Sequence, residues 1–175
     1  GVLGKFPMLK LTDRHEGKKP PIIFTAIGPK SLEFAGAHCD GVLLHPFVST
    51  TGVKNSTKIV RDAAEKAGRD PMSVRIYHNI IVAPDLPKDE EDAVVRGRAI
   101  TYFELPGFGD LIVDINEWDK GVLDQIRAHP KIAGLNGKPA DQAYTRQELV
   151  DVGEILPQSW IDEGAAVGTA AQCAD

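Results

Sequence analysis

Residues Pro20–Leu44 read PPIIFTAIGPKSLEFAGAHCDGVLL, and this stretch predicts the fold. Its apolar run Ile22–Ile27 has the length and the β-branched content of a buried strand. Gly28 ends that run, and Pro29 suits the first position of a helix, where its missing N–H costs nothing. We therefore predict a strand that is followed at once by a helix over Pro29–His38.

The predicted helix leads through a turn at Asp40-Gly41 into a second apolar run, Val42–Leu44. The apolar side chains that we expect to point inward from the helix are Leu32, Phe34, Ala35 and Ala37. Neither strand run alternates with polar residues, as is typical of parallel strands that are covered on both faces. Strand, helix and strand thus predict a βαβ unit with a right-handed crossover.

The carboxyl ends of these two strands, Thr25–Gly28 and Leu44–Pro46, should lie side by side at one edge of the sheet. In open α/β sheets and in (β/α)8 barrels, that edge is where ligands bind. The helix start at Gly28 also presents free backbone N–H groups and a positive dipole end, which suit a phosphate or carboxylate. By pattern alone, Gly28-Pro29 is more simply explained as an ordinary helix start.

The rest of the chain continues to alternate helices and strands. We predict a polar loop over Val48–Asn55, a helix over Ser56–Ala67, a long third strand over Ser73–Pro84 and a helix over Lys88–Leu105. Further on, Thr145–Glu148 has the form of a capping box that opens another helix. Because no internal repeat or linker interrupts the chain, we treat residues 1–175 as a single α/β domain.

The composition limits the classes of function. The chain is 42% hydrophobic and 26% charged, and it contains neither an apolar span long enough for a membrane nor a signal peptide. A formal net charge of −5 argues against nucleic acid as a partner. Cys39 and Cys173 form neither a metal-binding spacing nor a disulfide framework. We therefore expect no metal, no membrane and no nucleic acid, and a reducing, cytoplasmic setting.

The stretch Pro20–Leu44 resembles the central signature of the luciferase-like monooxygenase family, and within it that of the coenzyme F420-dependent oxidoreductases. The residues that carry the likeness are Pro20-Pro21, Gly28-Pro29, Leu32, Ala35-Gly36 and Asp40-Gly41. The segment Leu156–Thr169, LPQSWIDEGAAVGT, is similar to the segment before the last helix of the family. The likeness covers most of the chain and is weakest over Pro106–Ala143.

This resemblance implies an α/β fold that is a partial (β/α)8 TIM barrel. The predicted strands would be the fifth to seventh, with a helical insertion over about residues 106–155 before the last strand. Such a set cannot close a barrel, so the missing strands come from an absent part of the chain, from another copy or not at all. Both ends of the chain favour a fragment. The sequence of Gly1–Leu11 is more typical of the inside of a chain than of its start. The capping box at Thr169–Gln172 predicts the start of a helix, which would end at Asp175 after less than two turns.

The resemblance also implies an oxidoreductase that transfers hydride between F420 and a small organic molecule. Deazaflavin-dependent members contact the phosphate-bearing tail of the cofactor with backbone at the end of the signature strand. The corresponding residues here are Thr25, Ala26, Ile27 and Gly28. His45, after the next strand, corresponds to the border of the substrate or tail pocket, although an ordinary loop histidine explains it equally well. Ile27 departs from the commonest form of the family, which has a second glycine at that position.

The acid–base histidine and the ring-binding residues of the family lie on earlier strands, so we assign no catalytic residue in this chain and expect it to be inactive alone. We expect its partners to be other copies of the chain or the remainder of the barrel. Two alternatives stay open. One is an FMN-dependent monooxygenase, and the other is a non-catalytic α/β module that associates through its open sheet edges.

Overall fold

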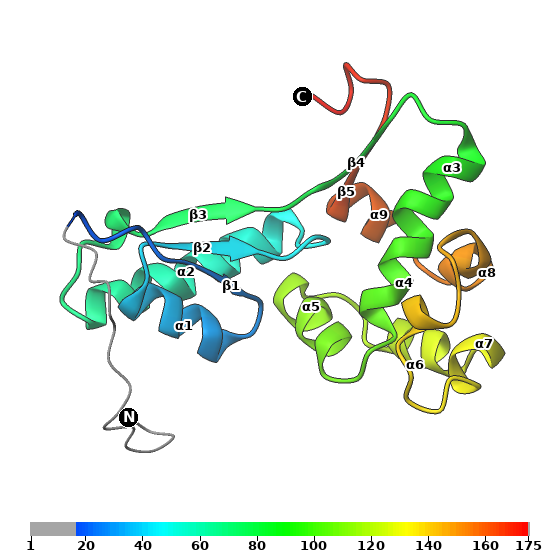
Figure 1. The fold of residues 1–175 in the computed structure, drawn as a ribbon, viewed down its shortest axis with the longest axis horizontal. Coiled ribbons are helices and arrows are strands. Elements are labelled where there is room, and N and C mark those ends of the chain that lie inside the picture. Colours follow the sequence, from blue (N-terminus) through cyan, green and yellow to red (C-terminus); the bar gives the residue numbers. More distant parts are fainter. Residues whose placement is uncertain (1–16, 175) are drawn as a thin grey trace.

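The structure, a computed structural model, describes residues 17–174, so the expectations for Gly1–Leu11 and Asp175 lie outside the described residues. The first part of the described chain is a parallel sheet with helical crossovers (Figure 1). Its elements are β1 (Ile23–Ala26), α1 (Pro29–His38), β2 (Gly41–Leu44), α2 (Thr50–Lys66) and β3 (Arg75–His78). β2 lies between β1 and β3 and is parallel to both, which confirms the predicted strand order and the βαβ unit.

The register of this sheet separates a covered face from an open one. Phe24, Val42 and Ile76 are paired in register, and Val42 is fully buried against α1 and α2. The next pairs place Thr25, Leu43 and Tyr77 on the opposite face, where Thr25 and Tyr77 are exposed. The helices α1 and α2 pack side by side, so both crossovers cover the same face of the sheet. The uninterrupted apolar sequence of the strands predicts a sheet that is covered on both faces, but within the described residues helices cover only one face.

Both helices of the first part differ in detail from the prediction. Leu32 and Ala35 of α1 are fully buried as expected, but the Phe34 side chain is 49% exposed, beside Phe24 and His38. Its predicted inward orientation is wrong, because on a helical wheel it lies nearly opposite Gly36, the residue of α1 that packs against Val60 of α2. Ala37 is only partly buried.

The second helix begins earlier than predicted. Residues 50–55 belong to α2, because Ser49 provides its N-cap by accepting a hydrogen bond from the Gly52 N–H at 3.2 Å. The predicted loop over Val48–Asn55 is therefore wrong for most of its length. A run of threonines and a glycine hid this helix from propensity alone.

The predicted third strand, Ser73–Pro84, is two strands in two sheets. β3 ends at His78, and β4 (Ile81–Pro84) pairs in parallel with β5 (Ala165–Gly168). A single uninterrupted strand is therefore wrong, because its two ends follow different partners. β5 was not predicted, since its sequence AAVG lacks the β-branched and aromatic residues that mark strands. The crossing between the two sheets is the long green ribbon of Figure 1.

The second part of the molecule, between β4 and β5, is helical (Figure 1). Its α-helices are α3 (Lys88–Asp92), α4 (Arg98–Phe103), α5 (Phe108–Asn116), α6 (Gly121–Ala128), α7 (Pro130–Ala133), α8 (Val150–Gly153) and α9 (Gln158–Gly164). The first two helices of this part, α3 and α4, are continuous through a π-helical turn at Ala93–Gly97. Short 3₁₀ turns lie at Pro71–Ser73, Ala140–Gln142 and Gln147–Leu149.

Both predicted capping boxes are present. The Thr145 hydroxyl and the Glu148 carboxylate exchange hydrogen bonds with backbone N–H groups at 3.3 and 2.8 Å. Thr169 and Gln172 do the same at 3.2 and 2.9 Å, and a turn follows them. In residues 17–174, none of the helices combines the length and the apolar character that crossing a membrane requires.

Candidate functional site

The carboxyl ends of β1 and β2 border a hollow of about 220 Å³. The site residues named from the sequence all line it: Thr25, Ala26, Ile27, Gly28 and His45. They come together because the two strands are parallel and in register, which puts Ala26 opposite Leu44 and His45 one residue beyond. Ser31 of α1 completes this wall, and Phe108 and Leu111 of α5 form the other one.

Gly28 stands at the junction between β1 and α1. Its φ of −75° and ψ of 156° are ordinary extended values, and no side chain caps the helix. The Ser31 hydroxyl and the Leu32 N–H both donate to the Gly28 carbonyl, at 2.8 and 3.0 Å. The N–H groups of the first turn have no partners within the helix, and the positive end of the helix dipole adds to their attraction for an anion.

The space in front of this junction is limited by Leu111. A Cβ atom placed on Gly28 would lie 3.2 Å from Leu111 Cδ2, closer than most Cβ contacts. A neighbouring hollow of about 480 Å³ is bordered by Gly28, Lys30 and Leu111. A phosphate can therefore approach the backbone here, with the Lys30 ammonium group on the same helical turn. Any side chain at position 28 would take part of that room.

His45 is held by two aromatic rings of the helical part. Its ring meets those of Tyr102 and Phe108 edge-on, with centroid distances of 4.6 and 5.0 Å. His45 Nδ1 lies 2.9 Å from the Pro46 carbonyl, which can only accept, so Nδ1 carries the proton and Nε2 is left as an acceptor. Burial lowers the pKa of the imidazole, and the positive charge of Arg98 acts in the same direction. Near neutral pH, His45 is therefore an uncharged imidazole.

The sequence did not indicate that Phe108, Leu111 and Tyr102 belong to this site. They lie on α4 and α5, more than fifty residues after His45, and Phe108 and Leu111 fall in the range where the likeness to the family is weakest. The one feature of the sequence that points to a turn here is the glycine of Pro106-Gly107-Phe108. Gly107 has a φ of 80°, which favours glycine, and the chain turns at this residue so that α5 faces the sheet. Only tertiary packing shows which strand end the turn faces.

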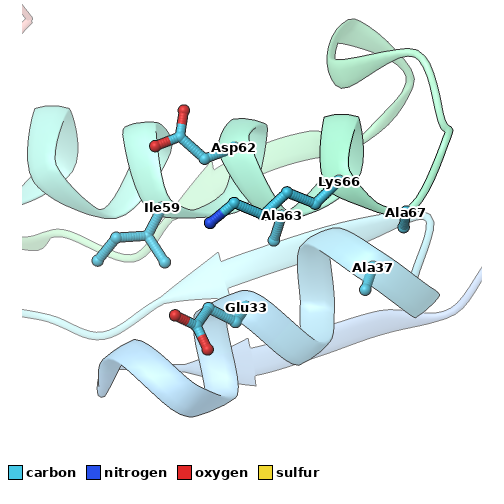
Figure 2. A pocket seen from close by; sticks show the side chains of 7 residues that line it. All are labelled: Glu33, Ala37, Ile59, Asp62, Ala63, Lys66 and Ala67. Atoms are coloured by element: carbon cyan, nitrogen blue, oxygen red, sulfur yellow. The ribbon is translucent and has the colours of Figure 1, made fainter.

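Another hollow lies between the helices α1 and α2 (Figure 2). It measures about 410 Å³ and lies between Glu33 and Ala37 of α1 and Ile59, Asp62 and Lys66 of α2. This groove shares no lining residue with the hollow at the carboxyl ends of the strands, and it has two carboxylates for one ammonium group. It suits an anionic cofactor less well than the Gly28 junction does.

The described residues contain no group of histidine, cysteine or acidic side chains arranged to hold a metal ion. His78 ends β3 beside Leu44, and burial lowers the pKa of its imidazole. It does not line the hollow at Gly28.

Comparison with known proteins gives the family. A sequence model described as the luciferase-like monooxygenase family matches residues 4–175. The chain belongs to this family. The residues of the Gly28 hollow all fall within the matched range.

Individual relatives of this luciferase-like chain include a reductase and a ketoreductase. It is 34% identical over 97 residues to a 5,10-methylenetetrahydromethanopterin reductase of Methanolobus tindarius, covering 54% of this chain and 28% of that protein. It is 26% identical over 162 residues to a phthiodiolone/phenolphthiodiolone dimycocerosates ketoreductase of Mycobacterium tuberculosis, covering 89% of this chain and 39% of the relative. The chain thus spans well under half of the length of either relative.

The fold resembles that of a coenzyme F420-dependent tetrahydromethanopterin reductase from Methanopyrus kandleri. The TM-score is 0.59 at 18% sequence identity, over 87% of this chain and 39% of that one. This likeness establishes an α/β fold with parallel strands, in agreement with the sequence prediction.

Proposed function

We propose that this chain is part of an F420-dependent oxidoreductase and that it holds the phosphate-bearing tail of the cofactor. One observation carries the proposal. The residues that the family resemblance assigned to the tail line a single hollow at the strand ends, beside an uncapped helix N-terminus. The name of the Methanopyrus protein specifies F420 and that of the Methanolobus protein specifies a reductase of a related methanopterin, and together they support the choice of cofactor.

The residues present fit such a tail. The backbone N–H groups at Lys30 and Ser31 would donate to phosphate oxygens, while Pro29 has no N–H to offer. Gly28 leaves room for the ligand, and Thr25 provides a hydroxyl on the open face of the sheet. His45, neutral and fixed by Tyr102 and Phe108, offers Nε2 as an acceptor at the border of the hollow. When bound, F420 supplies the ring that gives or takes hydride, and the protein positions it.

The same proposal includes the rest of a (β/α)8 barrel, in which β1–β3 would be the fifth to seventh strands. On the open face of the sheet, Ile23 is 48% exposed and Tyr77 is 36% exposed. Such exposed apolar residues are expected of strands that line the interior of a barrel when the other strands are absent. We expect residues 1–175 alone not to consume reduced F420 in the presence of a hydride acceptor, because no acid–base constellation is assigned in them. Steady turnover by the purified chain would contradict this.

The test of the tail site is Gly28→Val. Because φ at Gly28 is −75°, valine meets no backbone strain, and it acts by crowding Leu111 and the approaching ligand. We expect the dissociation constant for F420, measured by fluorescence titration, to rise at least about tenfold, or about 1.4 kcal/mol. Circular dichroism checks that the variant is folded.

Gly121→Val is the matched control, since Gly121 also stands at the start of a helix and the atoms nearest to its added Cβ belong to the Asp119 side chain, at 3.3 Å or more. A second variant, Leu111→Ala, should restore part of the affinity of Gly28→Val by making room. If wild type and Gly28→Val are both folded and have equal dissociation constants, the tail site is contradicted and the junction is an ordinary helix start.

The alternative is an FMN-dependent monooxygenase, which the description of the matched family favours. The absorbance spectrum of the cofactor that purifies with the protein separates the two, because the deazaflavin and flavin chromophores absorb at different wavelengths.

A further inference from the structure

A separate cleft of about 600 Å³ lies between α4, the start of α5 and the segment that leads into the Thr145 capping box. Its walls include Arg98 and Tyr102 of α4, Phe108 of α5, and Tyr144 and Arg146 of the facing segment. The sequence assigned no role to any of them. Phe108 also lines the hollow at Gly28, so the two cavities meet at this ring.

The arginines of this cleft differ from the other arginines of residues 17–174. Elsewhere the guanidinium groups donate hydrogen bonds: those of Arg61, Arg69, Arg75, Arg96 and Arg127. Within the same range, the guanidinium groups of Arg98 and Arg146 make no hydrogen bond and no ion pair. The two unpaired guanidinium groups thus line the same cavity.

Arg98 is the more informative of the two, because its Nε is buried without a hydrogen-bond partner. Its guanidinium carbon lies 5.4 Å from the centre of the Tyr102 ring, a cation–π contact that leaves the N–H donors unused. Buried donors without a partner are rare in native proteins, because a donor that is removed from water without a new acceptor destabilises the folded state. A bound acceptor would remove that cost.

The acidic groups near the cleft do not serve as this acceptor. Asp141 lines the cleft but forms no ion pair with Arg98 or Arg146 within the described residues. Glu104, which follows Arg98 by six residues, is buried. Its carboxylate accepts a hydrogen bond from the Ala140 N–H at 2.8 Å, and burial raises the pKa of this carboxyl group. Because one carboxylate and two guanidinium groups line the cleft, its charge suits a ligand with a single anionic group.

We propose that this cleft binds the anionic end of the organic substrate, a carboxylate or phosphate on a planar group, through Arg98 and Arg146. Arginine presents a planar fork of donors that matches either anion. The planar part would lie against Tyr102 and Phe108, which face both this cleft and His45. This proposal rests on the proposed function, because it places the substrate next to the cofactor hollow across Phe108.

Benzoate is the probe, with benzamide as its uncharged counterpart of the same shape. Titration of the 175-residue chain is followed by amide chemical shifts in ¹⁵N-labelled protein. We expect benzoate to shift signals of α4 and residues 141–146, and to bind at least about tenfold more tightly than benzamide. Equal affinities, or benzoate shifts confined to the region of Lys30, would overturn the proposal.

Arg98→Gln should weaken benzoate binding about tenfold or more, and Arg146→Gln about threefold, since Arg146 is more exposed. Arg98→Lys keeps the charge but loses the planar fork, so we expect it to bind benzoate more weakly than wild type. Arg75→Gln, on the open sheet, is the matched control and should leave binding unchanged. If Arg98→Gln does not fold, Arg98→Lys and Arg146→Gln decide, and unchanged affinity in both would overturn the proposal.

A titration of F420 distinguishes this inference from the proposed function. Benzoate that binds with F420 already present supports a substrate site, whereas mutually exclusive binding would assign the cleft to the cofactor and overturn the proposal. If F420 fails to bind while benzoate binds through Arg98, the proposed function fails and the anion site remains. If F420 binds and benzoate does not, only the anion site fails.

Discussion

The sheet part and the helical part of the molecule are stabilised in different ways. In the sheet part, α1 and α2 pack on one face of β1–β3 through small aliphatic side chains such as Ala35, Val42 and Val60. The helical part closes around a larger cluster rich in aromatic rings, in which Trp118 and Trp160 stack at 4.5 Å. The sheet part thus has one open face, whereas the helical part surrounds its core. The hollow at Gly28 lies where the two parts meet, whereas the cleft at Arg98 lies within the helical part.

The junction between the parts is narrow and partly polar. Asn116 of α5 accepts from the Ser49 N–H at 2.9 Å and donates to the Phe47 carbonyl at 2.7 Å, all in buried surroundings. Ile115 of α5 belongs to the core of the sheet part, while Ile27 and Phe47 belong to that of the helical part. Each part therefore inserts side chains into the core of the other. Substitutions in either part, or at the junction, should therefore have effects of different size.

The largest effect is expected from Phe103→Ala in the helical part. Phe103 is 1% exposed and packs against Phe47 and Trp160, with centroid distances of 5.8 and 5.4 Å. Its loss should lower the free energy of unfolding by about 3–5 kcal/mol, from lost burial and the cavity that remains. Urea titration with tryptophan fluorescence measures it, since both tryptophans lie in this part. Phe34→Ala, at an exposed phenylalanine, is the control and should cost under about 1 kcal/mol; equal losses would contradict the prediction.

Asn116→Ala tests the junction itself. It removes the acceptor of the Ser49 N–H and the donor to the Phe47 carbonyl, and leaves both groups buried. We expect a loss of about 2–3 kcal/mol in the free energy of unfolding. The transitions of the two parts should also separate when circular dichroism and tryptophan fluorescence are compared. Asn79→Ala, at an exposed asparagine, is the control. Coincident, unshifted transitions in Asn116→Ala would show that the junction does not couple the parts.

A smaller effect is expected from Asp110→Asn in the helical part. Arg127 Nη2 donates to Asp110 at 2.7 Å and lowers the pKa of the carboxyl to about 2 from 3.8. The ionised form is therefore stabilised in the folded state, so the contribution is present above about pH 4 and is lost as pH falls toward 2. The pair is partly exposed, so solvent screening limits the loss to about 1 kcal/mol. Urea midpoints from about pH 6 to 3 should fall less steeply in the variant than in wild type. Parallel curves would contradict this.

His45 gives the smallest expected effect, and it acts at the boundary between the parts. Burial lowers the pKa of its imidazole in the folded state, so below about pH 6.5 the unfolded chain binds the proton more readily. Stability is therefore highest above that pH and declines as pH falls. His45→Gln should reduce the decline between about pH 7 and 5. His78→Gln should also reduce it, because burial lowers the pKa of the His78 imidazole as well. An unchanged slope in the double variant would show that neither histidine contributes.

The parts also differ in how well their sequences predicted them. In the sheet part, the order of β1–β3, the helix α1 and the position of Gly28 followed from local signals within Pro20–Leu44. Propensity failed where tertiary contacts overrode it. Thr50–Asn55 is helical because Ser49 caps it, and Phe34 is exposed because α2 covers only part of α1. The strand β5 was missed because its stability comes from pairing with β4.

The sequence alone determined the parallel α/β class, the family, and the residues of the strand–helix junction at Thr25–Gly28 and His45, because these depend on short-range patterns of apolar runs, glycine and proline. The tertiary structure alone decided that Phe108 and Leu111 face this junction and that Arg98 and Arg146 share a cleft. Those contacts join residues far apart in the chain, and they arise from the packing of α4 and α5 against the ends of β1 and β2. Helical periodicity shows which side chains share one face of a helix, but only packing fixes what that face meets.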